Sequence, residues 1–395
     1  MTLEGYLKLN FENGEAYIRR DRISQIKEVD GIVFDCDGVL IDIRESYNKA
    51  ISKSVTYILE KMTGFPFSED LFSNEIIHMF RATGGFNDDW DTVYGIVMFT
   101  LSKMPSEIRK HLTMFIEEAG FKNSPISRLR FIENCWKKIE ANTLDAGFLS
   151  ELIKDLKDFI KILDSTGRRS VDENLLKIHE QDADFQHFHM LLKRFLNSKE
   201  VGKSVIATVF EELFCGARLF KETYGINPGI NMGPGLIENE RLIVKPKHLD
   251  SLISILGKKN LGIASGSRRR SAEYILGELI KKFNPKSLVF AEDVEAAEHL
   301  LKKPLKKPHP YSLLKAAEGF GKVRSIIYIG DSMEDAIMAS RARDEMGRVI
   351  FAGVYRYTIF EEEMRRIFLK YRCDIILPTV NELPSILEML GRRKN

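Results

Sequence analysis

The sequence has few cysteines and no long apolar run, and each shortage excludes a class of protein. Four cysteines lie far apart among 395 residues and form no Cys-x-x-Cys pair, as expected in a reducing compartment. The longest apolar run, Val93 to Leu101, is too short to span a bilayer. Met1 to Arg20 contains no apolar core of the kind found in signal peptides. We therefore expect a cytoplasmic protein without a membrane partner.

The chain also lacks an excess of charge of either sign. The formal net charge is +2, while 29% of residues are charged and 44% are hydrophobic. This balance is typical of a soluble globular protein and gives no reason to expect nucleic acid as a partner. A length of 395 residues indicates two domains, or one core that carries a large insertion.

The most informative segment is Asp-Cys-Asp-Gly-Val-Leu-Ile-Asp at 35–42, which follows the apolar run Gly31 to Phe34. Side chains two apart on an extended segment share one face, so Asp35 and Asp37 can point at one ligand. Gly38 gives the backbone freedom to turn sharply after them. This pattern favours a site that holds a metal ion and a nucleophile together. An acidic turn after a strand is the simpler alternative. Cys36 faces the opposite side and is expected in the core.

From residue 261 onward, apolar strands alternate with amphipathic helices. The expected strands after Gly31–Cys36 are Leu261–Ser265, Ser287–Ala291, Ser325–Gly330, Arg348–Val354 and Asp374–Leu377. Such alternation predicts an α/β fold, in which a parallel sheet is covered by helices on both faces. Ligands of these sheets bind at the carboxyl ends of the strands.

A long stretch after the first strand has a helical period and is interpreted as one inserted α-helical domain. The glycine-rich segment Gly225 to Asn239 would return the chain to the core, and Asp42 would cap the first inserted helix. Alternation around Asn13-Gly14 predicts a small N-terminal hairpin appendage. The expected domains are the hairpin at 1–28, the core at 29–43 and 241–395, and the helical insertion at 44–240.

Four polar segments stand at the ends of expected strands or at the start of the next helix. They are Asp35/Asp37, Ser265-Gly266-Ser267, Lys307-Pro308-His309-Pro310 and Gly330-Asp331-Ser332-Met333-Glu334-Asp335. Each segment also has a simpler interpretation when it is taken alone. Ser265 could be a helix cap and Lys307 a solvated surface lysine. Asp331 and Asp335 could cap and charge the start of a helix. In this order, the four resemble the haloacid dehalogenase superfamily of phosphohydrolases, in the subfamily with a helical cap inserted after the first motif. The resemblance covers residues 30–43 and about 241–380, whereas the insertion matches only in position and helical character.

The resemblance implies a Rossmann-like core and a Mg²⁺-dependent phosphatase. Asp35 would attack phosphorus and form an aspartyl-phosphate, and Asp37 would act as general acid and then general base. Mg²⁺ would be bound by Asp35, the Asp37 carbonyl and Asp331, with Asp335 orienting a bound water or Asp331. The expected substrate is a small phosphorylated metabolite, and the protein is expected to be a monomer or homodimer.

The same resemblance implies that Ser265, the Gly266 N–H and Lys307 hold the phosphate group. A phosphomutase would use the same two aspartates and remains an alternative. A dehalogenase needs no acid at Asp37, so that residue argues against it. A non-catalytic binding protein would be expected to lose motif residues, and none is lost.

Two further segments are candidates for substrate selection. Between Thr83 and Asp91 a glycine turn leads into a helix, where Asn87, Asp88 and Trp90 would form a specificity loop. The alternative is a helix start capped by Asn87 or Asp88, with Trp90 packed in the insertion. Arg268 follows the phosphate serine and would meet a second anionic group, unless it lies on a solvated helical turn.

Overall fold

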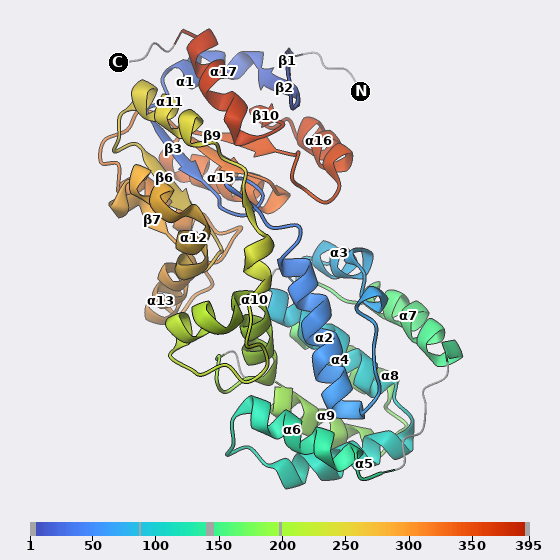
Figure 1. Ribbon diagram of the computed structural model, residues 1–395. Helices are drawn as coiled ribbons and strands as arrows, with labels where there is room; N and C mark the ends of the chain where they lie inside the picture. The colour runs from blue at the N-terminus through green and yellow to red at the C-terminus, as the bar shows by residue number, and fades with distance from the viewer. Residues whose placement is uncertain (1–4, 87, 140–145, 197–199, 392–395) are drawn as a thin grey trace. The chain divides into compact units, whose positions relative to one another are not determined.

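The computed structural model describes residues 5–86, 88–139, 146–196 and 200–391. The chain forms two compact units, which are treated separately below. One unit contains Met1–Arg44 and Glu240–Asn395, and the other contains Glu45–Asn239. These junctions lie one residue from the boundaries predicted for the insertion. Figure 1 follows the chain from the sheet of the first unit into the helices of the second and back.

The first unit is built on an eight-stranded sheet with the strand order β1-β2-β10-β9-β8-β3-β6-β7. The strands are β1 (Tyr6–Phe11), β2 (Gly14–Arg19), β3 (Gly31–Phe34), β6 (Leu261–Ala264), β7 (Leu288–Val289), β8 (Ile326–Gly330), β9 (Val349–Val354) and β10 (Ile375–Leu377). From β10 to β7, all neighbouring strands pair in parallel. The predicted parallel sheet of an α/β fold is confirmed.

Side chains alternate between two buried cores, one on each face of this sheet. In β3, Ile32 and Phe34 belong to one core, whereas Val33 belongs to the other. The first core includes residues of α11 (Pro246–Leu256), α12 (Arg269–Leu276) and α17 (Leu383–Met389). The second includes residues of α13 (Ala291–Leu301), α14 (Tyr311–Glu318), α15 (Met333–Met346) and α16 (Glu361–Lys370). A strand buried on both faces explains why its sequence is continuously apolar.

The N-terminal hairpin is part of the core sheet, which corrects its interpretation as a separate appendage at 1–28. Strand β2 pairs antiparallel with β10, where Ile18 lies opposite Ile375. The short helix α1 (Ile23–Lys27) then leads into β3. The Tyr355 hydroxyl donates to the Glu15 carbonyl at 2.8 Å and accepts from the Glu15 N–H at 3.0 Å. The hairpin therefore extends the sheet and satisfies the exposed edge of β10.

The chain leaves and re-enters the first unit through a two-stranded antiparallel sheet of β4 (Ile41–Asp42) and β5 (Arg241–Leu242). The prediction that Asp42 caps the first inserted helix is wrong. Its carboxylate accepts from the Arg44 guanidinium at 2.7 and 2.8 Å instead. Helix α2 (Tyr47–Thr63) begins later, with Ser46 at its N-cap position. The extended backbone of β4 separates Asp42 from that helix.

The named elements among the described residues of the second unit are helices. After α2 it contains α3 (Asn74–Ala82), α4 (Asp89–Ser102), α5 (Ser106–Ala119), α6 (Pro125–Trp136), α7 (Ala146–Ile160), α8 (Arg168–Ile178), α9 (Phe185–Leu196) and α10 (Val205–Tyr224). Helix α4 is buried nearly all round, as its almost uninterrupted apolar sequence requires. None of the helices that the structure describes is long and apolar enough to cross a membrane.

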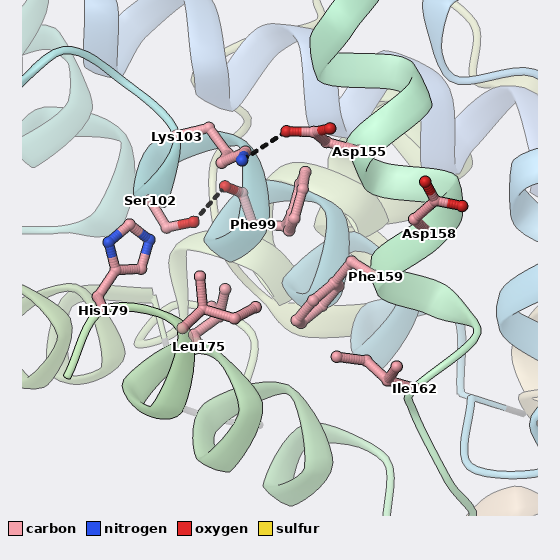
Figure 2. A pocket seen from close by; sticks show the side chains of 10 residues that line it. Phe99, Ser102, Lys103, Asp155, Asp158, Phe159, Ile162, Leu175 and His179 are labelled. Carbon is pink, nitrogen blue, oxygen red and sulfur yellow. Dashed lines mark hydrogen bonds and ion pairs between the residues drawn. The ribbon is translucent and has the colours of Figure 1, made fainter.

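Residues of α4, α7 and α8 and of the turns that follow them line an open pocket of about 280 Å³ in the helical unit (Figure 2). Its lining includes the apolar side chains Phe99, Phe159 and Leu175. The charged groups at its rim are neutralised by neighbours, because Lys103 pairs with Asp155 at 2.5 Å and Asp158 pairs with Lys161 at 2.7 Å.

Candidate active site

Three adjacent strands of the core sheet end in polar residues. Strand β3 lies between β6 and β8, so Asp35, Ser265 and Asp331 follow neighbouring strands at the same edge. The chain runs outward from β3 to β6 and β7, and then continues on the other side of β3 with β8. This reversal of strand order is the place where open parallel sheets bind ligands. The fold therefore brings the predicted motifs to one location.

The turn after β3 presents Asp37 beside Asp331. Gly38 has a φ of +70° and its N–H donates to the Ile41 carbonyl at 2.8 Å, which closes the turn. Its Cα has no room for a side chain, because the Asp331 carboxylate occupies that position. Cys36 is fully buried in the core, as predicted. The glycine thus permits close contact between the Asp37–Gly38 backbone and the acid at the end of β8.

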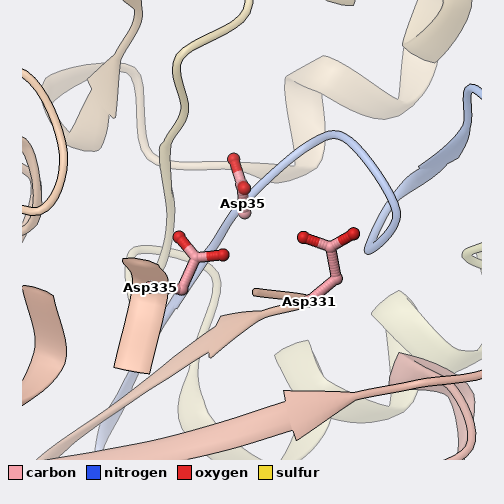
Figure 3. A group of neighbouring side chains, drawn as sticks. All are labelled: Asp35, Asp331 and Asp335. Carbon is pink, nitrogen blue, oxygen red and sulfur yellow. The ribbon is translucent and has the colours of Figure 1, made fainter. Parts of the chain in front are cut away.

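Three carboxylates converge at this edge (Figure 3). One oxygen each from Asp35, Asp331 and Asp335 lies within 4.8 Å of the other two. Burial raises the pKa of Asp331 well above its usual value, and the charges of Asp335 and Asp35 raise it further. Among the described residues, no hydrogen-bond donor reaches the Asp331 carboxylate. The charge of Lys307 lowers the pKa of Asp331 but does not outweigh burial and the neighbouring acids, and a bound cation would relieve the remaining imbalance.

Lys307 supplies positive charge to the other two acids. Its Nζ lies 2.8 Å from Asp35 Oδ2 and 2.8 Å from Asp335 Oδ1, and only 15% of its side chain is exposed. Burial alone lowers the pKa of Lys307, but the charges of Asp335 and Asp35 outweigh burial and raise it well above its usual value. Lys307 is thus a buried, charged bridge and not the solvated lysine that its basic run allowed.

Asp335 is saturated with hydrogen-bond donors. Its Oδ2 accepts from the Ser332 hydroxyl at 2.7 Å and from the Ser332 N–H at 3.2 Å, in a capping box at the start of α15. Its Oδ1 accepts from Lys307 and from the Tyr328 hydroxyl at 2.7 Å. Burial raises the pKa of Asp335, yet these partners, Lys307 foremost, hold it below its usual value. A carboxylate accepts about four hydrogen bonds, so no position is left for direct metal binding.

The residues present fit a magnesium ion. With Asp335 occupied, Asp35 and Asp331 remain as carboxylate ligands, and Mg²⁺ in proteins is usually held by one or two carboxylates. Burial raises the pKa of Asp35, while Lys307 and a hydrogen bond from Ser265 counteract that rise. An oxygen-only donor set of this size suits a hard cation that keeps several waters.

Ser265 directly follows β6 beside the acids and does not cap the next helix, because Arg268 holds the N-cap position of α12. The side chain is buried, and its Oγ lies 2.9 Å from the Ser267 Oγ. A Cβ atom added to Gly266 would meet no atom within 4 Å. The segment therefore combines a fixed hydroxyl with open space at Gly266, where an anion could be bound.

The residues predicted to select the substrate have local structural partners. Arg268 donates to the Glu295 carboxylate at 2.6 and 3.1 Å. Asp88 caps α4 by accepting from the Trp90 N–H at 3.0 Å. Trp90 is 9% exposed, and its indole donates to Glu211 at 3.2 Å. Asn87 lies outside the described residues. Helix capping and packing therefore account for these contacts of Asp88 and Trp90, and a role in specificity stays a prediction.

Two residues near these aspartates were assigned no role from the sequence. Tyr328 lies within β8, and its hydroxyl donates a hydrogen bond to Asp335. The sequence of this strand indicates only a buried core strand. A single tyrosine in the aliphatic run Ile326–Gly330 was the available signal. Glu334 follows in the next helix, where burial, and then the charge of Asp335, raise its pKa to about 7.

Comparisons with known proteins agree with this geometry. The family model of haloacid dehalogenase-like hydrolases matches residues 234–343, so this part of the chain is similar to a haloacid dehalogenase-like hydrolase domain. An X-ray structure from the Northeast Structural Genomics Consortium is similar over 92% of this chain and 99% of that chain, with 17% identity and a TM-score of 0.63. This likeness shows a shared fold.

A second solved structure, phosphatase Tt82 from Thermococcus thioreducens, has 21% identity and a TM-score of 0.47, over 86% of this chain and 98% of that chain. No curated protein matches the sequence.

Proposed function

We propose that this protein is a Mg²⁺-dependent phosphatase that hydrolyses a small phosphorylated metabolite through an aspartyl-phosphate on Asp35. The observation that carries the proposal is the bridge of Lys307 between Asp35 and Asp335, beside the Asp331 carboxylate, which no donor among the described residues reaches. A buried carboxylate held by an ammonium group, next to a cation site, is suited to attack an anionic phosphate. The hydrolase family of the core domain supports this assignment.

In the first half-reaction, a carboxylate oxygen of Asp35 attacks phosphorus and forms the acyl-phosphate bond, while the bond from phosphorus to the ester oxygen breaks. Asp37 donates a proton to the departing oxygen, which leaves as the alcohol. Asp35 and Asp331 would hold Mg²⁺, which would supply positive charge that offsets the repulsion between carboxylate and phosphate. Lys307 and Ser265 hold the remaining phosphate oxygens in line for attack.

In the second half-reaction, Asp37 accepts a proton from a water molecule, whose oxygen attacks phosphorus. The acyl-phosphate bond breaks, inorganic phosphate leaves, and the Asp35 carboxylate is restored. Asp37 directly precedes the Gly38 turn and is partly exposed, so it can meet both the leaving oxygen and water. Covalent catalysis of this kind divides a barrier that is otherwise among the highest in biology.

The decisive experiment measures hydrolysis of p-nitrophenyl phosphate by three variants. Asp35→Asn abolishes turnover, because an amide forms no acyl-phosphate. Asp37→Asn is slower by about 10²–10⁴-fold, the usual contribution of a general acid–base group. Asp42→Asn is the matched control from the same segment, since Asp42 contacts Arg44, and it keeps wild-type rates. Wild-type turnover by Asp35→Asn would show that the nucleophile is wrongly assigned.

Metal dependence is tested separately. Activity disappears in EDTA and returns with added Mg²⁺, while Ca²⁺ inhibits because its larger and looser shell misplaces the nucleophile. Full activity of EDTA-treated protein in metal-free buffer would contradict the metal assignment. The roles of Asp35 and Asp37 would then depend on the results with the aspartate variants alone.

A further inference from the structure

We propose that Tyr328 is a positioning residue of this site. Its hydroxyl fixes the carboxylate of Asp335, which in turn fixes the Lys307 ammonium group against Asp35. The inference rests on the proposed function, because it assigns Tyr328 a part in placing the nucleophile. In this role Tyr328 acts on the nucleophile through Asp335 and Lys307.

The first support is the hydrogen bond itself. The Tyr328 hydroxyl lies 2.7 Å from Asp335 Oδ1, and its next acceptor, the Ala264 carbonyl, is 3.4 Å away. Tyr328 is completely buried, so this hydrogen bond is shielded from bulk solvent. Burial, and then the negative charge of Asp335, raise the pKa of Tyr328 well above its usual value. The phenol therefore keeps its proton and donates it to Asp335.

The second support is the shared acceptor. Asp335 Oδ1 accepts from both Tyr328 and Lys307, and the Lys307 Nζ lies 5.7 Å from the centre of the Tyr328 ring. The ring thus limits the ammonium group on one side, while Asp335 and Asp35 hold it on the other. Hydrogen bonds that share a buried acceptor influence one another strongly in a low dielectric.

The third support is the rigidity of the donor. Tyr328 lies in the central strand β8, and its ring packs 6.3 Å from that of Phe351 in the second core. Strand β8 also pairs with β3, where Phe34 precedes Asp35 and lies opposite Ile329. The hydroxyl is therefore held by the same two strands that carry the acids, which is the arrangement needed to set distances between them.

Removal of the hydroxyl has a directional consequence. Asp335 Oδ1 loses one of its two donors, so its charge attracts the remaining donor, Lys307, more strongly. The ammonium group then moves toward Asp335 and away from Asp35, which leaves the nucleophile less well oriented. The site as a whole becomes no less negative, so Mg²⁺ binding does not weaken. A loss of kcat without a loss of Mg²⁺ affinity is the signature of positioning.

The experiment compares wild type with Tyr328→Phe, which keeps the ring and removes only the donor. With p-nitrophenyl phosphate at saturating Mg²⁺, kcat falls about tenfold and KM changes less than twofold. This loss is smaller than the 10²–10³-fold typical of a donor that contacts the transition state. Calorimetric titration of the metal-free proteins with MgCl₂ gives equal or tighter binding for the variant.

Tyr355→Phe is the matched control. Tyr355 is also a buried core tyrosine, and its hydroxyl bonds to the Glu15 backbone far along the sheet. This variant loses thermal stability as Tyr328→Phe does, but keeps wild-type kcat.

The proposal is overturned if Tyr328→Phe also keeps wild-type kcat, or if weaker Mg²⁺ binding explains the whole loss of kcat. Tyr328→Met fills similar space without a donor and serves if the first variant does not fold. Failure of both to fold overturns the proposal in favour of a purely structural role.

An activity-independent measurement separates this inference from the proposed function. In crystal structures of the metal-free proteins, the Lys307–Asp35 contact lengthens in Tyr328→Phe, and an unchanged contact would overturn the inference. If wild type hydrolyses no phosphate ester while the contact changes as described, the proposed function fails and the positional relationship stands.

Discussion

A Cβ atom on Gly38 would lie 2.1 Å from Oδ2 of Asp331, so the turn after β3 and the acid after β8 are in direct contact. Real Cβ atoms do not approach an oxygen so closely, and the next nearest atoms belong to the same short, half-buried side chain. Gly38 also has a φ of +70°, which disfavours any residue with a side chain. Two independent constraints therefore require glycine where the turn that carries Asp37 meets the proposed metal ligand.

Gly38→Ala is expected to lower turnover by about 100-fold, because a displacement of about 1 Å at a catalytic site costs about that much. Mg²⁺ affinity falls as well, since Asp331 must move to make room. Steady-state rates and calorimetric Mg²⁺ titration measure the two effects. Gly321→Ala is the control, because Gly321 has a φ of +76° but no atom within 4 Å of its added Cβ. Equal losses in both variants would assign the effect to backbone strain alone.

Lys307→Ala removes the only cation that the described structure places between Asp35 and Asp335. The two carboxylates then repel each other, and the phosphate loses a positive partner. We expect kcat to fall by about 10²–10³-fold, as for the loss of other preorganised electrostatic groups. The neighbouring Lys306→Ala serves as control, since Lys306 is exposed and lies 3.9 Å from Glu295. Similar rates for the two variants would contradict the assigned role of Lys307.

The polar edge of the sheet was predictable because its residues directly follow apolar strands. The positions of Asp35, Ser265 and Asp331 follow from the predicted ends of their strands. The carboxyl ends of parallel strands lie at the same edge of a sheet, so these residues are expected to lie together. The contacts of Lys307 depended on the family resemblance, because its loop has no regular period.

Other features could not be predicted, because they depend on contacts between distant segments. The pairing of Ile18 with Ile375 joins opposite ends of the chain and leaves no local pattern. Tyr328 reads as an ordinary strand residue until the position of Asp335 in the following helix is known. Asp42 was misassigned because acids before a helical segment often cap it, whereas β4 continues through Asp42 and holds it in extended backbone.

The helical unit contains a buried carboxylate whose titration affects stability. Asp172 accepts from Tyr94 at 2.6 Å and lies 3.1 Å from His189 Nε2 and 2.5 Å from Lys193 Nζ. Burial raises its pKa, but these three partners outweigh burial and hold the pKa below its usual value. An aspartate has a pKa of about 4 in the unfolded chain. Because the pKa of Asp172 is lower than this in the folded protein, its ionised carboxylate stabilises the fold above about pH 4. This stabilisation is lost as the pH falls through the pKa of the folded state.

Asp172→Asn is therefore expected to lower the free energy of unfolding by roughly 2 kcal/mol at pH 6, as for hydrogen bonds to a charged group. The difference in free energy of unfolding between the variant and wild type becomes smaller as the pH falls below about 4. Urea unfolding followed by circular dichroism at several pH values measures this difference. Asp158→Asn is the control, because Asp158 is an exposed partner of Lys161 and such pairs contribute little. A difference that stays constant across this pH range would contradict the argument.

The last prediction concerns Asp88 and separates helix capping from substrate selection. Asp88→Ala removes the cap of α4 and is expected to cost about 1 kcal/mol of stability. Asp88→Ser keeps a good capping oxygen but removes the carboxylate, so it preserves stability. If the carboxylate helps to select substrate in the proposed phosphatase, both variants change the ratio of kcat/KM among natural phosphate esters by about tenfold, or about 1.4 kcal/mol. The small ester p-nitrophenyl phosphate is hydrolysed at wild-type rates by both. An Asp88→Ser variant with the substrate profile of wild type would restrict Asp88 to capping α4.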